Sequence, residues 1–417
     1  EAVEGAKDAI KGLDELFGKG GQMGAGPTFD EKTYAKAKPH FKSAYEHFKS
    51  AGKSLIEFAK YCIEKWGDAI RPYLKRFMEE MKAEEEAGPA EPVETELLQP
   101  EATEQEVTAQ MGAADDIRKI IESGETLTKA MAHDIMAKRY GGTMAQGKFT
   151  AKDQSDMIEL ATNMYIRRFA GRFNPSVGTA ESALIAIANL KALLERLPTQ
   201  TTRTEEQVQL QQFSTPPPQA YVAAWAADIH PGDVVLEPSA GLFGLGVFAK
   251  NAGAKVIANE LSPRRAALMT PTGFADIITV KNAEHIHAIL APEIAKGTVP
   301  RPTVVLMNPP FSNAATSNIS KTQIGAMHVE EALKTLPQGG RLVAIVGEGM
   351  AHDRPTFTGW WKKIAGKYNV RANIHVSGDE YRKYGTTFGN QLVVIDNSGP
   401  TPTGGTITGS VNKIEEL

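Results

Sequence analysis

Between about residue 200 and residue 398, short apolar runs alternate with stretches long enough to form helices. Five of these runs are apolar along most of their length, which is typical of strands buried in a parallel sheet. Two further runs, joined by a polar stretch with glycine, predict an antiparallel hairpin at the end of the sheet. The pattern therefore predicts a doubly wound α/β fold with a mixed seven-stranded sheet. The predicted strands are 234–236, 255–258, 277–280, 303–307, 341–346, 373–376 and 391–395.

The residues before this sheet have the spacing of amphipathic helices. In residues 28–82, aromatic and aliphatic residues recur three and four positions apart, and lysines occupy the other faces. We favour a helical hairpin with solvated lysines here, while a nucleic-acid or partner surface stays open. A second helical domain is predicted over 111–200. Its clearest helix runs from Ser182 to Leu197 and is followed by Pro198.

Three segments lack the apolar residues that a packed core requires. Residues 1–27 are small and rich in glycine, and 399–417 contains glycine, proline and threonine, so both are predicted to be flexible. Residues 83–110 are rich in glutamate and contain prolines, which predicts a linker. The α/β domain is then expected to span 201–398.

The net charge of −4 at first argues against a nucleic-acid partner. Residues 79–106, however, hold 11 acids and one base, so this segment carries −10 and the remainder of the chain sums to +6. Residues 200–398 hold 18 bases and 16 acids and are close to neutral. The charge distribution therefore leaves DNA and RNA open as partners.

Composition excludes several kinds of site. Cys62 is the only cysteine, so an intramolecular disulfide and a cysteine-based zinc site are impossible, and a reducing, cytoplasmic setting is expected. No apolar run reaches the roughly 18 residues of a membrane span. His285 and His287 lie two residues apart beside Glu284, but this segment offers fewer converging ligands than a metal site needs. No metal site is therefore predicted. The chain begins at Glu1, which fits a processed product or a piece of a longer protein.

Candidate binding residues follow the first two predicted strands, because ligands of open α/β sheets bind outside the carboxyl ends of the strands. A glycine-rich turn after the first strand lets backbone approach a ligand, and the acid at its start can accept from an amine or a hydroxyl. An acid after the second strand, Glu260, is expected to accept from two ribose hydroxyls. The turn consists of Glu237, Pro238, Ser239, Ala240, Gly241, Leu242, Phe243 and Gly244.

The most specific motif follows the fourth predicted strand and reads Asn308-Pro309-Pro310-Phe311. The two prolines remove backbone donors and fix the turn. The Asn308 side-chain carbonyl and the Pro309 backbone carbonyl would then face one point, beside the flat Phe311 ring. Two acceptors and a ring would hold an exocyclic amine and stack on its base. By concentrating charge on the amine nitrogen, they would favour its attack on an electrophile without a strong general base.

The order of these motifs resembles that of class I S-adenosylmethionine-dependent methyltransferases acting on adenine N6 in DNA, in particular the γ group. The resemblance covers about residues 205–398 and implies a Rossmann-like fold with S-adenosylmethionine as cofactor. It implies catalytic roles for Asn308, Pro309, Pro310 and Phe311. It likens 385–388 to the family's penultimate motif. It implies cofactor contacts for Phe213, Thr215 and Pro216, Glu237 to Gly241 with Gly244, Glu260, Leu261, Asn282, Ala283 and Asn308.

The resemblance also implies a partner and a mode of action. Duplex DNA hides the adenine amine, so the target base would be flipped out. Specific enzymes of the γ group carry a sizeable recognition domain after the core, whereas about 20 residues follow it here, which leads us to expect low sequence specificity. The general character of the sequence also resembles that of the methyltransferase modules of phage and mobile-element methylase–helicase proteins. DNA and a helicase or restriction-related protein are therefore the expected partners.

One departure from the family keeps two alternatives open. The family usually has Gly-x-Gly in the first turn, whereas Phe243 stands here before Gly244. Either the loop bulges and Gly244 takes over, or cofactor affinity is low. A degenerate methyltransferase fold used as a binding module is one alternative. Because Asn-Pro-Pro-Phe also occurs in enzymes that methylate adenine N6 or guanine N2 in RNA, an RNA methyltransferase is the other.

Overall fold

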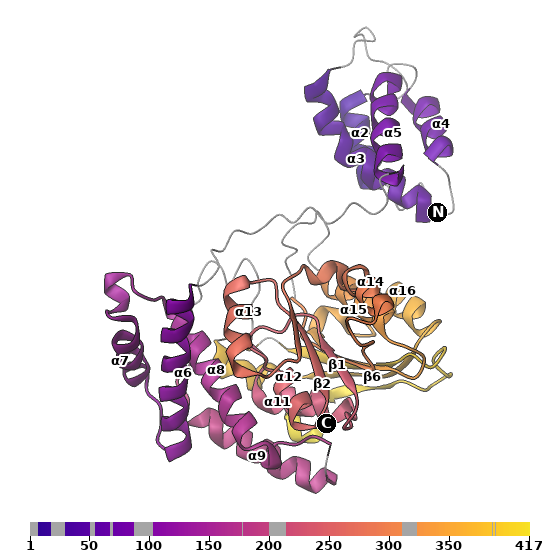
Figure 1. The fold of residues 1–417 in the computed structure, drawn as a ribbon. Helices are drawn as coiled ribbons and strands as arrows, with labels where there is room; N and C mark the ends of the chain where they lie inside the picture. The colour runs from indigo at the N-terminus through magenta and orange to yellow at the C-terminus, as the bar shows by residue number, and fades with distance from the viewer. Residues whose placement is uncertain are drawn as a thin grey trace. The chain divides into compact units, whose positions relative to one another are not determined.

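The computed structural model describes residues 7–17, 30–50, 55–66, 70–86, 103–176, 178–199, 214–310, 323–385, 387 and 389–417 (Figure 1). The chain divides into two compact units, Glu1–Val93 and Glu94–Leu417. The division falls inside the acidic segment that the sequence predicts to be a linker. None of the described helices is long and apolar enough to cross a membrane.

The described part of the first unit contains four helices around an aromatic core, where the sequence predicts a helical hairpin. Phe41, Phe58 and Phe77 are fully buried, and the Phe77 ring centroid lies 5.5 Å from that of Phe41 and 6.2 Å from that of Phe58. A helix also lies within residues 1–27, which the glycine content led us to expect to be flexible. Leu13 and Phe17 of this helix are buried against the core. The helices are α2 (Lys7–Phe17), α3 (Glu31–Ser50), α4 (Leu55–Trp66) and α5 (Arg71–Glu86).

The second unit begins with helices that share one core with the α/β sheet. Thr103 and Glu106 form a capping box at the start of the first of these helices, so the helix begins inside the predicted 83–110 linker. Residues of the predicted 111–200 domain belong to the same buried cluster as residues of the sheet, for example Leu190 with Val235. The helices are α6 (Glu104–Ser123), α7 (Lys129–Tyr140), α8 (Ala151–Arg168) and α9 (Ala180–Glu195).

The sheet contains eight strands in the order β3-β2-β1-β4-β5-β7-β6-β8, so the prediction of seven strands is wrong by one. The first five strands are parallel, and β7 runs antiparallel to β5 and to β6. The additional strand, β8, pairs parallel with β6 and lies in 399–417, which we expected to be flexible. The strands are β1 (Val234–Glu237), β2 (Lys255–Asn259), β3 (Ile277–Thr279), β4 (Val304–Met307), β5 (Arg341–Gly347), β6 (Asn369–Val376), β7 (Asn390–Asp396) and β8 (Ile407–Val411).

Helices cover both faces of the sheet (Figure 1). On one face, α11, α12 and α13 share a core with α6–α9, and α12 contacts α8 while α11 contacts α9. On the other face, α14, α15 and α16 share a second core. The α6–α9 helices therefore lie close enough to the strand ends to reach a site there. The flanking helices are α11 (Pro217–Ala226), α12 (Gly246–Asn251), α13 (Pro263–Met269), α14 (Ile286–Lys296), α15 (Ile324–Thr335) and α16 (Pro355–Ala365).

Candidate functional site

A pocket lies beyond the carboxyl ends of β1, β2 and β4, where the parallel topology brings the turns after these strands together. Its wall combines residues of those turns with side chains from α8, α13 and α15. The lining residues are Glu159, Ser214, Thr215, Glu237, Pro238, Ser239, Ala240, Gly241, Gly244, Leu245, Asn259, Glu260, Leu261, Arg265, Lys281, Asn282, Ala283, Glu284, Asn308, Pro310 and His328.

Most residues that the sequence nominated as cofactor-binding or catalytic line this one pocket. Pro216 and Pro309 follow or precede lining residues but do not line it themselves. Phe213 and Phe311 lie outside the described residues. Turns separated widely in sequence therefore converge at the pocket, from the glycine turn after β1 to Asn308 after β4.

The backbone of the glycine turn removes the Phe243 side chain from the pocket. Phe243 adopts a positive φ of 75°, is fully buried, and stacks on Phe274 with ring centroids 5.5 Å apart. Its ring is part of the core between sheet and helices, whereas Gly244 lines the pocket. Gly244, the next residue in the turn, therefore lines the pocket, and the Phe243 ring does not.

The Glu237 side chain holds the end of this turn through hydrogen bonds to its backbone. Its carboxylate accepts hydrogen bonds from the backbone N–H groups of Leu245 (3.3 Å) and Gly246 (2.9 Å) at the start of α12. Burial raises the pKa of Glu237 well above its usual range, while these two hydrogen bonds lower it. A buried acid therefore holds the glycine turn against the sheet.

Gly246 is expected to tolerate no side chain, although it stands at the start of a helix. A Cβ atom at this position would lie 2.6 Å from Glu237 Oε2 and 2.7 Å from the Phe243 ring. We expect Gly246→Ala to lower the free energy of unfolding by about 1–3 kcal/mol through overpacking. Chemical denaturation measures the change.

A matched control for this prediction is Gly359→Ala within α16, where a Cβ would meet nothing within 4 Å. Since alanine is the better helix former, that variant should be stabilised by up to about 1 kcal/mol. Equal responses of the two variants would contradict the packing that we describe around Gly246.

The turns after β1, β2 and β3 are tied to one another by two buried side chains. Glu260 accepts from the backbone N–H groups of Gly241 (2.7 Å) and Ser262 (2.9 Å). Asn259, which the sequence did not single out, donates through Nδ2 to the carbonyls of Pro238 and Lys281, both at 2.9 Å. These hydrogen bonds join the turns into one wall of the pocket.

Asn308 is oriented by the segment that precedes α11. Its Nδ2 atom donates a hydrogen bond to Thr215 Oγ1 at 2.8 Å. The contact sets which way the amide faces and joins the turn after β4 to the segment before α11. The buried Tyr381 phenol lies beside Asn308, and burial raises its pKa.

Several pocket residues carried no local sequence pattern that could have revealed them. Glu159 comes from α8, and Arg265 comes from α13. His328 of α15 is buried, its Nδ1 atom has no hydrogen-bond partner among the described residues, and burial lowers its pKa to about 4. Within the same described ranges, no three His, Cys, Asp or Glu side chains are grouped to hold a metal ion.

Arginines and aromatic residues alternate at the end of α8 and just after it. Tyr165 and Phe173 are buried in the core. Arg167 donates to Asn251 at 3.1 Å, and Arg168 pairs with Glu122 at 2.8 Å. These contacts give the cluster a role in packing α8 against its neighbours.

No protein-family model and no curated protein matches the chain. Solved structures do match. One is a provisionally assigned modification subunit of a type I restriction enzyme from Vibrio vulnificus YJ016, at 15% identity and a TM-score of 0.38, covering 60% of this chain and 58% of that chain. A provisionally assigned class I S-adenosylmethionine-dependent methyltransferase from Listeria monocytogenes matches at 11% and 0.43, covering 75% and 94%.

A third match is a provisionally assigned RNA methyltransferase from Pyrococcus horikoshii, at 17% identity and a TM-score of 0.37, covering 51% of this chain and 98% of that chain. The chain thus spans less than two thirds of the Vibrio protein to which it is similar. All three TM-scores lie below 0.5, so conclusions about function come from the chain's own topology and site residues.

Proposed function

We propose that the chain is a class I S-adenosylmethionine-dependent methyltransferase that methylates the N6 amine of adenine in DNA. The observation that carries the proposal is the position of Asn308 and Pro310, which line the same pocket as the glycine turn after β1 and Glu260 after β2. A cofactor held by that turn would thus meet a target amine held at Asn308. Base flipping, low sequence specificity, a helicase or restriction-related partner and a cytoplasmic location complete the proposal.

The charge of the pocket fits this cofactor. Four carboxylates line it, Glu159, Glu237, Glu260 and Glu284, against the two basic side chains Arg265 and Lys281. S-adenosylmethionine carries an ammonium and a sulfonium against one carboxylate, so an acidic lining suits it. Glu260, Asn282 and Ala283 line this pocket, and in the proposal Glu260 accepts from the ribose hydroxyls while Asn282 and Ala283 meet the adenine. The residues present therefore fit the group.

The protein's own part in the reaction is positioning and electrostatics. S-adenosylmethionine supplies the electrophilic methyl group. Asn308 accepts a hydrogen bond from the target amine and stabilises the positive charge that develops on its nitrogen as the new bond forms. Thr215 keeps the Asn308 amide oriented through its 2.8 Å hydrogen bond. The amine then loses a proton to solvent.

The proposal is tested by methyl transfer from labelled S-adenosylmethionine to duplex DNA, single-stranded DNA and RNA in parallel. We expect label in DNA, recovered as N6-methyladenine. Label found in RNA alone would show that the substrate is RNA and not DNA. Failure to bind S-adenosylmethionine in calorimetry would favour a degenerate binding module. Mapping methylated adenines on a plasmid tests specificity, because a single long consensus sequence would contradict low specificity.

The degenerate-module alternative receives no support from the glycine turn. Its sequence-level basis was Phe243, and the structure buries that ring in the core. An RNA substrate is the second candidate, because the proposed contacts of Asn308 reach the base amine and not the sugar that distinguishes RNA from DNA.

A further inference from the structure

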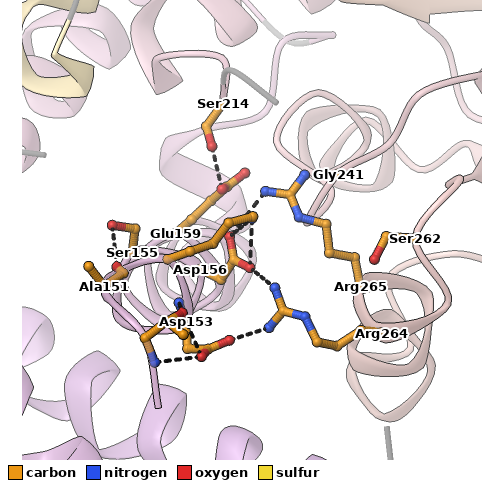
Figure 2. A network of polar contacts seen from close by, with 12 residues as sticks. Ala151, Asp153, Ser155, Asp156, Glu159, Ser214, Gly241, Ser262, Arg264 and Arg265 are labelled. Carbon is orange, nitrogen blue, oxygen red and sulfur yellow. Dashed lines mark hydrogen bonds and ion pairs between the residues drawn. The ribbon is translucent and has the colours of Figure 1, made fainter. Parts of the chain in front are cut away.

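Helix α8 contributes a carboxylate to the pocket, although it belongs to the helical region before the sheet. Glu159 lines the pocket, and Ser214 donates its hydroxyl to Glu159 Oε2 (Figure 2). Among the described residues, Glu159 Oε1 has no hydrogen-bond partner. By contrast, both oxygens of Glu237 and of Glu260 accept backbone N–H groups. Glu159 thus differs from Glu237 and Glu260 in having one oxygen without such a contact.

A buried ion network holds α8 in place beside the pocket. Asp156, one turn before Glu159, accepts from Lys152 Nζ at 3.0 Å, Arg264 Nη2 at 2.6 Å and Arg265 Nη2 at 3.0 Å. Figure 2 shows the two arginines reaching from α13 toward Asp156 on α8. Since α13 directly follows the turn that carries Glu260, the network connects the cofactor-side turn to α8. The position of Glu159 is therefore fixed.

Two oxygen acceptors lie near Gly244. A Cβ built on Gly244 would lie 3.9 Å from the Thr215 carbonyl oxygen and 4.0 Å from Glu159 Oε1. A primary ammonium has three N–H donors and is bound by several acceptors at once. A sulfonium has no hydrogen to donate. Burial raises the pKa of Glu159 because it disfavours the charged carboxylate, and a cation bound beside it would favour that charged form.

We propose that Glu159 Oε1 and the Thr215 carbonyl bind the ammonium group at the amino-acid end of the cofactor. The helical residues 103–199 would then complete the cofactor site in addition to packing on the sheet. This inference rests on the proposed function and assigns a specific part of the cofactor to a helix outside the α/β region.

The test is Glu159→Gln in the full chain, examined by calorimetry with three ligands. S-adenosylmethionine and S-adenosylhomocysteine both carry the ammonium, whereas 5′-methylthioadenosine lacks the amino-acid end. We expect the variant to bind the first two ligands about 10- to 100-fold more weakly, because it loses one charge-assisted hydrogen bond to the ammonium. Its affinity for 5′-methylthioadenosine should be unchanged, which would show that the rest of the pocket is intact.

The matched control is Glu181→Gln, the same substitution at an exposed position in the first turn of α9, which should change none of the three affinities. Unchanged binding of S-adenosylmethionine by Glu159→Gln would overturn the inference, and so would an equal loss for all three ligands. In either case, methyl transfer by the wild-type chain would leave the proposed function standing. A wild-type chain that binds no S-adenosylmethionine would overturn both.

Discussion

Replacing Asn308 with alanine is expected to slow methyl transfer about 100- to 1,000-fold while S-adenosylmethionine still binds. The variant removes the acceptor that stabilises charge on the target amine, and groups of this kind contribute about 10²- to 10³-fold to kcat. Cofactor binding should survive because most of the pocket wall comes from the turns after β1, β2 and β3. Single-turnover methyl transfer and calorimetry measure the two properties separately.

Asn308→Asp is the informative companion variant. It keeps a side-chain oxygen that can accept from the target amine and a second oxygen near Thr215 Oγ1, which lies 2.8 Å from Asn308 Nδ2 in the wild-type chain. We expect it to retain more transfer than the alanine variant. If Asn308→Ala methylates at the wild-type rate, the assignment of the catalytic site is wrong.

The parallel part of the sheet could be predicted because its strands are buried on both faces and are therefore apolar throughout. Strand β8 gave no such pattern: Ile407 is 63% exposed, and the strand is held by backbone pairing with β6. Helix α2 was missed for a different reason. Its apolar residues Leu13 and Phe17 have helical spacing, but the glycines that follow dominate the composition of residues 1–27.

The candidate site was predictable to the extent that it is made of turns after parallel strands. Topology alone brings Glu260 and Asn308 to one edge of the sheet. The position of Glu159 could not be predicted in this way, because it lies on a helix and nothing near it in sequence distinguishes it from an exposed acid such as Glu181. Only the packing of α8 against α12 and the ion pairs to α13 carry it to the pocket.

The direction of the Phe243 side chain also depended on tertiary structure. From sequence, a bulky residue in the glycine turn left two outcomes open. The positive φ of Phe243 is unfavourable for a residue with a Cβ, at a cost of about 1–2 kcal/mol. Burial of the whole ring against Phe274 offsets that cost, and this contact is invisible to local patterns.

Asp156→Ala is expected to be the most destabilising single substitution that we propose. Asp156 and Lys152 are each only 2% exposed, and Asp156 also pairs with Arg264 and Arg265. Removing the carboxylate leaves Lys152 and Arg265 buried as uncompensated like charges. Breaking a buried ion pair in this way costs about 3–5 kcal/mol. Urea unfolding measures the loss. Hydrogen exchange in peptides from the sheet distinguishes unfolding of the second unit from unfolding of the first.

The pH dependence of the stability of the second unit, Glu94–Leu417, gives another, independent measure of the Asp156 network. The three neighbouring cations hold the pKa of Asp156 well below its ordinary value of 3.8, although burial opposes them. A carboxyl whose pKa is lower in the folded state stabilises the fold above its unfolded pKa and loses that contribution as the pH falls toward the folded value. The wild-type sheet should therefore lose stability below about pH 4, and Asp156→Ala should lose less of its remaining stability there. Asp134→Ala, at a side chain 84% exposed, should change stability by under about 0.5 kcal/mol. If the two alanine variants unfold at the same urea concentration, the network does not hold α8 to α13, and the fixed position of Glu159 beside the pocket loses its support.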